Sequence, residues 1–260
     1  MTTSSTGNES NVRENQELAA LGMAFPRWQD AVEAAIGTQR LAVTGEVRGG
    51  QLIQYSDPSG AQLNILAVEP YATFVGFAAQ TSAFGHVTML NDVLALIDIV
   101  DPYGETVTSA TANLAQGPLL VDEDTQQWQQ VGLTALGLEV AEADPNTAES
   151  EPDLFRSAGA EIVAAGSGAQ TPTPAVEFSG RVMEAEWQDN ALTGQRFMHV
   201  MVDGKVPFDL CLPESFGALP AQDTVLTGRA LLTASIVAPG AGCGSGGGGC
   251  GCGSCGCGGH

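Results

Sequence analysis

The residues with the clearest chemistry lie close together near the end of the sequence. The stretch CGCGSCGC places thiols at Cys250, Cys252, Cys255 and Cys257. Cys252 and Cys255 have the spacing with which paired thiolates chelate a tetrahedral Zn²⁺ or an iron atom. Because four thiolates complete one tetrahedral site, the spacing predicts a metal centre at these four positions.

Two further donors extend this segment. Cys243 precedes the four thiols and His260 follows them, and we expect both to act as spare or exchange ligands. Glycine beside nearly every thiol permits positive φ angles and a tight wrap around an ion. Dense thiolates favour soft ions, so Zn²⁺ and Cu(I) are the expected metals. An iron–sulfur cluster is a weaker alternative, because a surface segment would protect it poorly.

Residues 241–260 contain no large apolar side chain. Such a segment cannot bury a core, so we expect this tail to be disordered unless a metal organises it. Its Cys-x-Cys pairs resemble the clusters of metallothioneins, which implies thiolate metal binding and no particular fold. The resemblance is confined to the tail, and the tail departs from those proteins in lacking lysine and in being mostly glycine.

Two other interpretations of the tail stay open. In the first, the tail is a low-complexity extension and the protein is a non-catalytic structural or interaction protein. In the second, the Gly-Cys-Ser run is similar to the cores of azole-containing microcins, in which Cys and Ser become heterocycles. The chain would then be a precursor for modifying enzymes, with an unusually large folded leader.

The charge of the chain limits its partners. The 260 residues include nine Lys and Arg against thirty Asp and Glu, for a net charge of −21, and the one lysine is Lys205. Nucleic acids and anionic membranes bind through clustered basic side chains. We therefore expect no nucleic-acid partner and no membrane association, whereas a protein partner remains open.

The apolar runs are too short for a membrane helix. The run VLALIDIV at 93–100 includes Asp98, whereas a membrane helix needs about 20 apolar residues. The opening MTTSSTGNES has neither the basic nor the apolar part of a secretory signal. These features predict a cytoplasmic protein with reduced thiols.

Residues 1–40 are predicted to form an N-terminal segment with two short helices. Leu18, Leu21 and Phe25 have helical spacing. A second apolar face begins at Trp28, and Gly37 is a natural end for that helix.

The rest of the chain is predicted to be mainly β, with two small barrel-like units at residues 41–140 and 175–240. Short β-rich runs alternate there with turn residues, as in DPSG at 57–60 and DPYG at 101–104. Between the units, residues 141–174 are rich in acids, Pro and Gly and are predicted to be a linker. One short helix is expected in it, with Asp153 as N-cap and Gly166 as its end.

The two β-rich units have similar motifs in the same order. VTGEV (43–47) has a counterpart in FSGRV (178–182), and SAFG (82–85) has one in ESFG (214–217). This order predicts an internal repeat. A unit of five short strands is typical of an oligonucleotide/oligosaccharide-binding (OB) barrel or an SH3-like barrel.

The sequence offers little evidence of an enzyme. It contains no HExxH, nucleophile-elbow GxSxG or P-loop motif. His199 and Cys211 each lie in a predicted strand and are interpreted as structural. His86 follows a Phe-Gly pair and is expected to be exposed. We therefore favour a non-catalytic protein.

Overall fold

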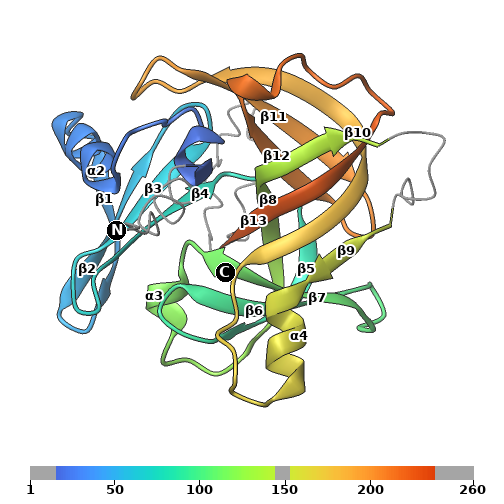
Figure 1. Ribbon diagram of the computed structural model, residues 1–260. Coiled ribbons are helices and arrows are strands. Elements are labelled where there is room, and N and C mark those ends of the chain that lie inside the picture. Colours follow the sequence, from blue (N-terminus) through green and yellow to red (C-terminus); the bar gives the residue numbers. More distant parts are fainter. Residues whose placement is uncertain (1–15, 144–152, 238–260) are drawn as a thin grey trace, which may run out of the picture.

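The computed structural model describes residues 16–143 and 153–237, and this part of the chain is mainly β (Figure 1). The strands form two sheets, one of four strands and one of nine. The mainly β class predicted from the sequence is therefore confirmed. No helix in these two ranges is long and apolar enough to cross a membrane.

The smaller sheet is an antiparallel meander in the order β1-β2-β3-β4. Its strands are β1 (Leu41–Val47), β2 (Gly50–Ser56), β3 (Ala61–Leu66) and β4 (Ala72–Phe77). The predicted turn at 57–60 joins β2 to β3: Gly60 N donates to Asp57 O at 2.9 Å, and Gly60 has a φ of 93°. Glycine adopts this φ without strain.

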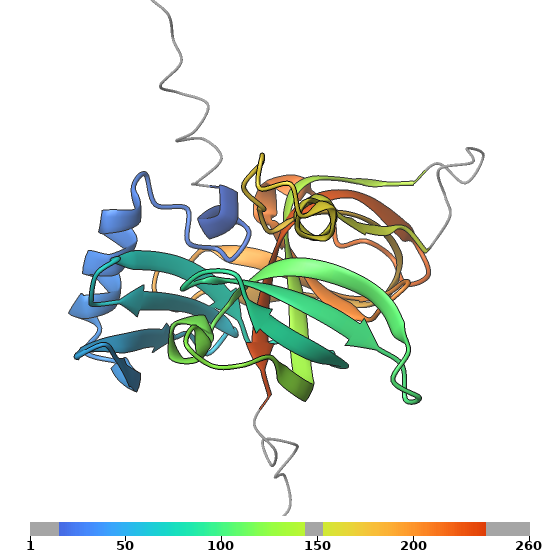
Figure 2. The ribbon, with the colours of Figure 1, turned by 90° about the horizontal axis from the view of Figure 1, so that it is seen from below.

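The N-terminal helices lie against the smaller sheet. Residues 16–19 are helical, and α2 (Trp28–Gly37) ends at the glycine predicted from the sequence. Figure 2 shows α2 beside the sheet. Leu18, Leu21 and Ala35 belong to a buried cluster that also contains Tyr55 and Phe77 of the sheet. Burial of this apolar face stabilises the short helices more than their intrinsic propensity does.

The larger sheet has the order β11-β12-β8-β5-β6-β7-β13-β10-β9, with additional pairings of β11 with β10 and of β8 with β13. Its strands are β5 (Ala83–Met89), β6 (Leu94–Val100), β7 (Thr106–Leu114), β8 (Gln126–Glu142), β9 (Phe155–Ser157), β10 (Ala175–Asp189), β11 (Arg196–Asp203), β12 (Phe208–Pro213) and β13 (Val225–Ile236). Three short helices connect some of them: α3 (Gly117–Leu120), α4 (Ala158–Ala165) and the 3₁₀ helix η1 (Glu214–Phe216).

The pairings close into two rings that share β8 and β13. In the first ring, β5, β6 and β7 form an antiparallel meander, β7 pairs in parallel with β13, and β8 pairs antiparallel with β13 and β5. In the second ring, β10, β11 and β12 form the meander, β12 pairs in parallel with β8, and β13 pairs antiparallel with β8 and β10. The two rings therefore have the same pattern of pairing.

This arrangement differs from the predicted units at 41–140 and 175–240. Residues 41–77 form a sheet of their own, and β8 pairs with β12 and β13 from the second half of the chain. The physical reason is the length of β8, 17 residues: one edge pairs with β5 at residues 126–131 and then with β12 at residues 134–136, while β13 pairs along the other edge. The predicted counterparts also occupy different positions, since residues 83–85 are the first three residues of β5 whereas 214–217 forms η1 and the residue after it.

In the described part of the predicted linker at 141–174, β8 ends at Glu142 and two further elements of regular structure follow. Strand β9 pairs with β10, and α4 follows it directly. Ser157 rather than Asp153 is the N-cap, because its side chain accepts a hydrogen bond from Ala160 N. Gly166 ends the helix with a φ of 60°, as predicted. Residues 144–152 lie outside the described ranges.

The largest buried cluster extends through both rings. It contains Ile97 and Leu114 from the first ring, Val200 and Phe208 from the second, and Leu133 from the shared strand β8. Phe197, Cys211 and Leu136 instead face the N-terminal helices and the smaller sheet. The outer side of β11 and β12 is thus a second buried surface, and it positions the site described next.

Candidate functional site

The sequence-predicted metal ligands lie outside the described part of the chain. Cys243, Cys250, Cys252, Cys255, Cys257 and His260 all follow residue 237, so their arrangement remains a prediction. Within residues 16–143 and 153–237, no group of three or more His, Cys, Asp or Glu side chains is placed to hold a metal ion.

Cys211 is the one cysteine of the described ranges. It lies on β12 and is fully buried. Burial, together with the nearby negative charge of Asp209, raises the pKa of its thiol well above the usual value. A buried, protonated thiol is a poor nucleophile and a poor metal ligand. The structural role expected for Cys211 agrees with this environment.

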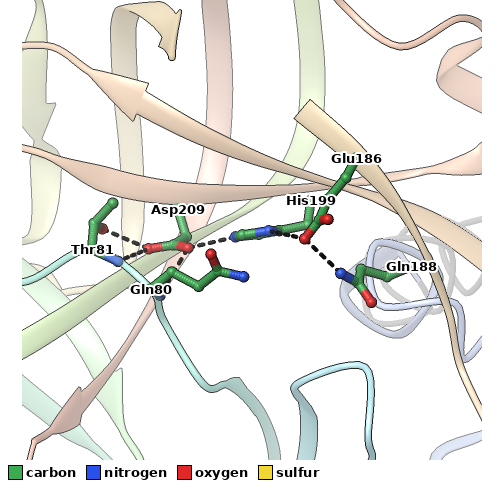
Figure 3. A network of polar contacts seen from close by, with 6 residues as sticks. All are labelled: Gln80, Thr81, Glu186, Gln188, His199 and Asp209. Atoms are coloured by element: carbon green, nitrogen blue, oxygen red, sulfur yellow. Dashed lines mark hydrogen bonds and ion pairs between the residues drawn. The ribbon is translucent and has the colours of Figure 1, made fainter. Parts of the chain in front are cut away.

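One polar site in the interior is a row of side chains from β10, β11 and β12 (Figure 3). His199 lies at its centre, 2% exposed, with Asp209 on one side and Glu186 on the other. The pairing of β11 with β12 places His199 opposite Cys211, two residues beyond Asp209, and the pairing of β10 with β11 places it opposite Glu186. Directly opposed residues such as Glu186 and His199 have Cβ atoms about 5 Å apart. His199 and Asp209 are diagonal neighbours, about 7–8 Å apart, which is still within reach of long side chains.

The two carboxylates approach different nitrogens of the imidazole. Asp209 Oδ1 lies 2.5 Å from His199 Nε2, and Glu186 Oε1 lies 3.4 Å from His199 Nδ1. Gln188 Nε2 donates to the same Glu186 oxygen at 2.6 Å. The ring of Phe77 packs against the imidazole at a centroid distance of 5.0 Å. These contacts fix the orientation of the ring.

Asp209 also binds the segment that leaves the smaller sheet. Its Oδ1 accepts from Gln80 N at 3.0 Å, and its Oδ2 accepts from Thr81 N at 2.9 Å and from Thr81 Oγ1 at 2.5 Å. Gln80 and Thr81 lie between β4 and β5. The side chain is inaccessible, and four partners compensate for the loss of water around it.

The geometry favours a structural clamp over a catalytic centre. A histidine oriented by a buried aspartate also occurs in hydrolases, where the other ring nitrogen contacts a hydroxyl or thiol nucleophile. Here both described partners of the His199 nitrogens are carboxylates. The side chain of Glu186 is 45% exposed, so the row runs from the interior to the surface.

Sequence analysis identified His199 as structural but missed Asp209 and Glu186. The available signal was Asp209 itself, a single charge within the otherwise apolar FDLCL. Such a charge inside a strand implies a buried partner. Two of its partners, Gln80 and Thr81, are more than 120 residues away along the chain. No local sequence pattern reveals such a contact.

Comparison with known proteins provides no further guide to this site. The chain matches no protein-family model, no curated protein and no solved structure.

Proposed function

We propose that the protein is a cytoplasmic β-scaffold whose C-terminal tail, residues 241–260, binds one soft metal ion, Zn²⁺ or Cu(I), for storage, sensing or delivery. The observation that carries the proposal is the ligand spacing. Cys252-x-x-Cys255 has the chelating spacing, and Cys250 and Cys257 extend it on either side as the Cys-x-Cys pairs 250/252 and 255/257. Cys243 and His260 are spare or exchange ligands in this proposal.

Two features of the described fold support a separate metal-binding tail. The last strand of the described residues, β13, ends at Ile236, and Val237 N donates to Gln130 O at 2.8 Å, so both rings close within the described part of the chain. The thiol of Cys211 is buried and unsuited to metal. Metal binding is therefore expected to order the tail alone, in contrast to a zinc finger, whose fold requires its ion.

The test is a competition titration of the reduced full-length protein against a chromophoric chelator. We expect uptake of one equivalent of Zn²⁺ or Cu(I), and truncation after Pro239 should abolish it while leaving the β circular dichroism and the melting midpoint unchanged. Replacing Cys252 and Cys255 with serine should weaken binding more than the matched change Cys243→Ser. Absence of uptake by the reduced protein would favour the low-complexity interpretation.

Intact mass distinguishes the remaining alternative, a precursor for azole formation. A bound metal adds mass in native spectra and is removed by acid. Each azole instead lowers the covalent mass by one water and two hydrogens, and acid does not restore it. Protein purified from its own host is the required sample.

The proposal includes the absence of a nucleic-acid partner. This expectation is supported by the scarcity of basic residues, nine in 260, and by the net charge of −21. Too few cations are available to displace the counterions of a phosphate backbone. Micromolar binding of a labelled random oligonucleotide at physiological salt, measured by anisotropy, would contradict it.

We also infer that each ring of strands is an OB-type barrel. Its support is the shared pattern of an antiparallel meander whose third strand pairs in parallel with a closing strand. In the second ring the long first strand, β10, changes partner at Arg181, from β13 to β11, just after Gly180. A crystal structure in which either ring stays open would contradict this inference, and the fold type alone implies no activity.

A further inference from the structure

Several exposed aromatic side chains gather on the outer side of the first ring, around β5 and the start of β8. We define this aromatic patch as Phe84, His86, Tyr103 and Trp128. Phe84 is 52% exposed, Tyr103 91% and Trp128 49%. Large aromatic side chains left in water at one place are a feature of binding surfaces.

The backbone is locally distorted where it presents Trp128. Gly85 pairs with Gln129 and Val87 pairs with Gln126, so two residues of β8, one of them Trp128, face the single residue His86. Trp128 has a φ of 55°, a left-handed conformation that a residue with a large side chain adopts rarely. Bulges of this kind redirect a side chain, and strained backbone of this kind concentrates at binding sites.

Contacts with both neighbouring segments hold the indole in place. Trp128 N donates to His86 Nδ1 at 3.1 Å, and the two rings meet edge to face at a centroid distance of 5.4 Å. The indole also lies against Gly104 of the β6–β7 turn, where an added Cβ would be 3.3 Å from it. Trp128 is therefore ordered although half of it is exposed, so little side-chain entropy would be lost at this position when a ligand binds.

The segment that carries the patch has acidic side chains only, and two of its acids pair with arginines from elsewhere in the chain, Asp92 with Arg48 and Glu139 with Arg229. From Ala83 to Glu142 the sequence contains no Lys or Arg, whereas its acidic residues are Asp92, Asp98, Asp101, Glu105, Asp122, Glu123, Asp124, Glu139 and Glu142. Asp98 is the cross-strand neighbour of His86, and Asp101 and Glu105 flank Tyr103 in the turn. Cationic groups bind well where carboxylates surround an aromatic face.

We propose that the aromatic patch binds a Lys/Arg-rich segment of a partner protein. A guanidinium or ammonium group stacks on Trp128 or Tyr103, and the carboxylates of Glu105 and Asp98 complement its charge. Phosphate-rich ligands are repelled by this surface, and a second copy of the chain would bring the same negative charge. The patch acts independently of metal binding by the tail.

The probe is a short fluorescein-labelled peptide of alternating Arg and Gly, titrated with the full-length protein and followed by anisotropy at low ionic strength. Saturable binding is expected, whereas a peptide of alternating Gln and Gly should not bind. Because any acidic protein attracts a cationic peptide weakly, the decisive comparison is between variants.

Trp128→Ala should weaken binding about tenfold, as expected for loss of a desolvated cation–π contact. Tyr103→Ala and Glu105→Gln, both at exposed positions, should each weaken it severalfold and provide variants that do not alter the bulge. Tyr71→Ala is the matched control: Tyr71 is 75% exposed, lies between β3 and β4, and follows Glu69 closely in sequence.

Equal affinities in Tyr71→Ala, Tyr103→Ala and Trp128→Ala would overturn the proposal, because binding would then be non-specific attraction to net charge. A monomer–dimer equilibrium in sedimentation velocity that Trp128→Ala abolishes would overturn it too, by assigning the patch to a second copy of the chain. Selective loss of peptide binding in the patch variants, with Tyr71→Ala unchanged, supports it.

Discussion

His199 Nε2 and Asp209 Oδ1 lie 2.5 Å apart in the interior, where the two residues are 2% and 0% exposed. Replacement of Asp209 leaves His199 Nε2 without an acceptor and also removes the acceptor of Gln80 N and Thr81 N, whereas replacement of His199 leaves Asp209 with its other three donors. Only the loss at His199 Nε2 is avoided when both side chains are replaced. We expect Asp209→Leu alone to lower the free energy of unfolding by about 3–5 kcal/mol. The double variant Asp209→Leu/His199→Phe should lose less than the sum of the two single variants, as measured by urea denaturation.

The control for this cycle is Glu186→Gln at the exposed end of the same row. Its side chain is 45% exposed and lies 3.4 Å from His199 Nδ1. Because solvent reaches Glu186, we expect this contact to contribute about as little as an exposed ion pair, about 0–1 kcal/mol. Strict additivity of the Asp209 and His199 variants would show that the pair is not energetically coupled.

Asp57 is a second buried carboxylate between the smaller sheet and the second ring. It accepts hydrogen bonds from Ser59 N and Oγ, from Tyr55 Oη at 2.8 Å, and from Ala191 N in the β10–β11 loop. Burial by itself would raise the pKa of Asp57, but these hydrogen bonds outweigh it and hold the pKa below its usual value. The same surroundings raise the pKa of Tyr55 to about 12, with burial as the larger cause.

A lowered folded-state pKa makes Asp57 a source of stability at neutral pH. Its contribution is complete above the unfolded pKa, about 3.9, and is lost as the pH falls through the lower folded value. Asp57→Asn should therefore cost about 1–3 kcal/mol at pH 7, and the difference from the wild type should shrink below about pH 4. Urea denaturation across this range is the measurement, with exposed Asp203→Asn as control; a gap that stays constant down to pH 2 would contradict the role of the charge.

Local features of this fold could be read from the sequence, whereas the contacts between its parts could not. The turns at 57–60 and 101–104, the end of α2 at Gly37 and the αL glycine at 166 follow from the residues present at those positions. Each depends on a few neighbouring residues, so a single sequence contains the necessary information.

The sharing of β8 and β13 between two rings depends on pairings between distant segments. Val131 and Ile236, for example, are partners more than a hundred residues apart. The motif SAFG/ESFG suggested a different correspondence, because Gly after an aromatic residue is favoured in many kinds of turn. Within the candidate site, the structural role of His199 could be predicted because its neighbours in the strand are apolar. Asp209 was missed because Gln80 and Thr81, which bind it, are remote in sequence.

Gly180 lies at the bend where β10 changes partner, so a substitution there tests the close approach of β10 and β11. The strand pairs with β13 up to Arg181 and with β11 from Arg181 onward. A Cβ at Gly180 would collide with Val202 Cγ1 of β11 and approach Asp203 O to 3.2 Å. Because the clash involves a packed core strand, Gly180→Ala should destabilise the protein by about 1–3 kcal/mol.

The matched substitution is Gly194→Ala, at a turn glycine with open space around it and a φ of 72°. Its cost comes from backbone conformation alone and should be about 1 kcal/mol. The melting midpoints of both variants, measured by circular dichroism, provide the comparison. An equal or smaller effect at Gly180 would mean that β10 and β11 do not approach each other so closely.

Cys211 reports on the buried surface between the second ring and the N-terminal helices. Its thiol is inaccessible, and its raised pKa keeps the reactive thiolate scarce. In a variant with serine at the five cysteines of the tail, we expect the native protein to resist a thiol-specific chromogenic reagent and the denatured protein to react completely. The native rate should increase with urea in parallel with unfolding, because reaction requires opening of the core. A Ser167→Cys substitution in the same background places a thiol at an exposed position and should react at once. Equal rates at Cys211 and at that exposed control would show that the helices and the smaller sheet do not cover β12 as described.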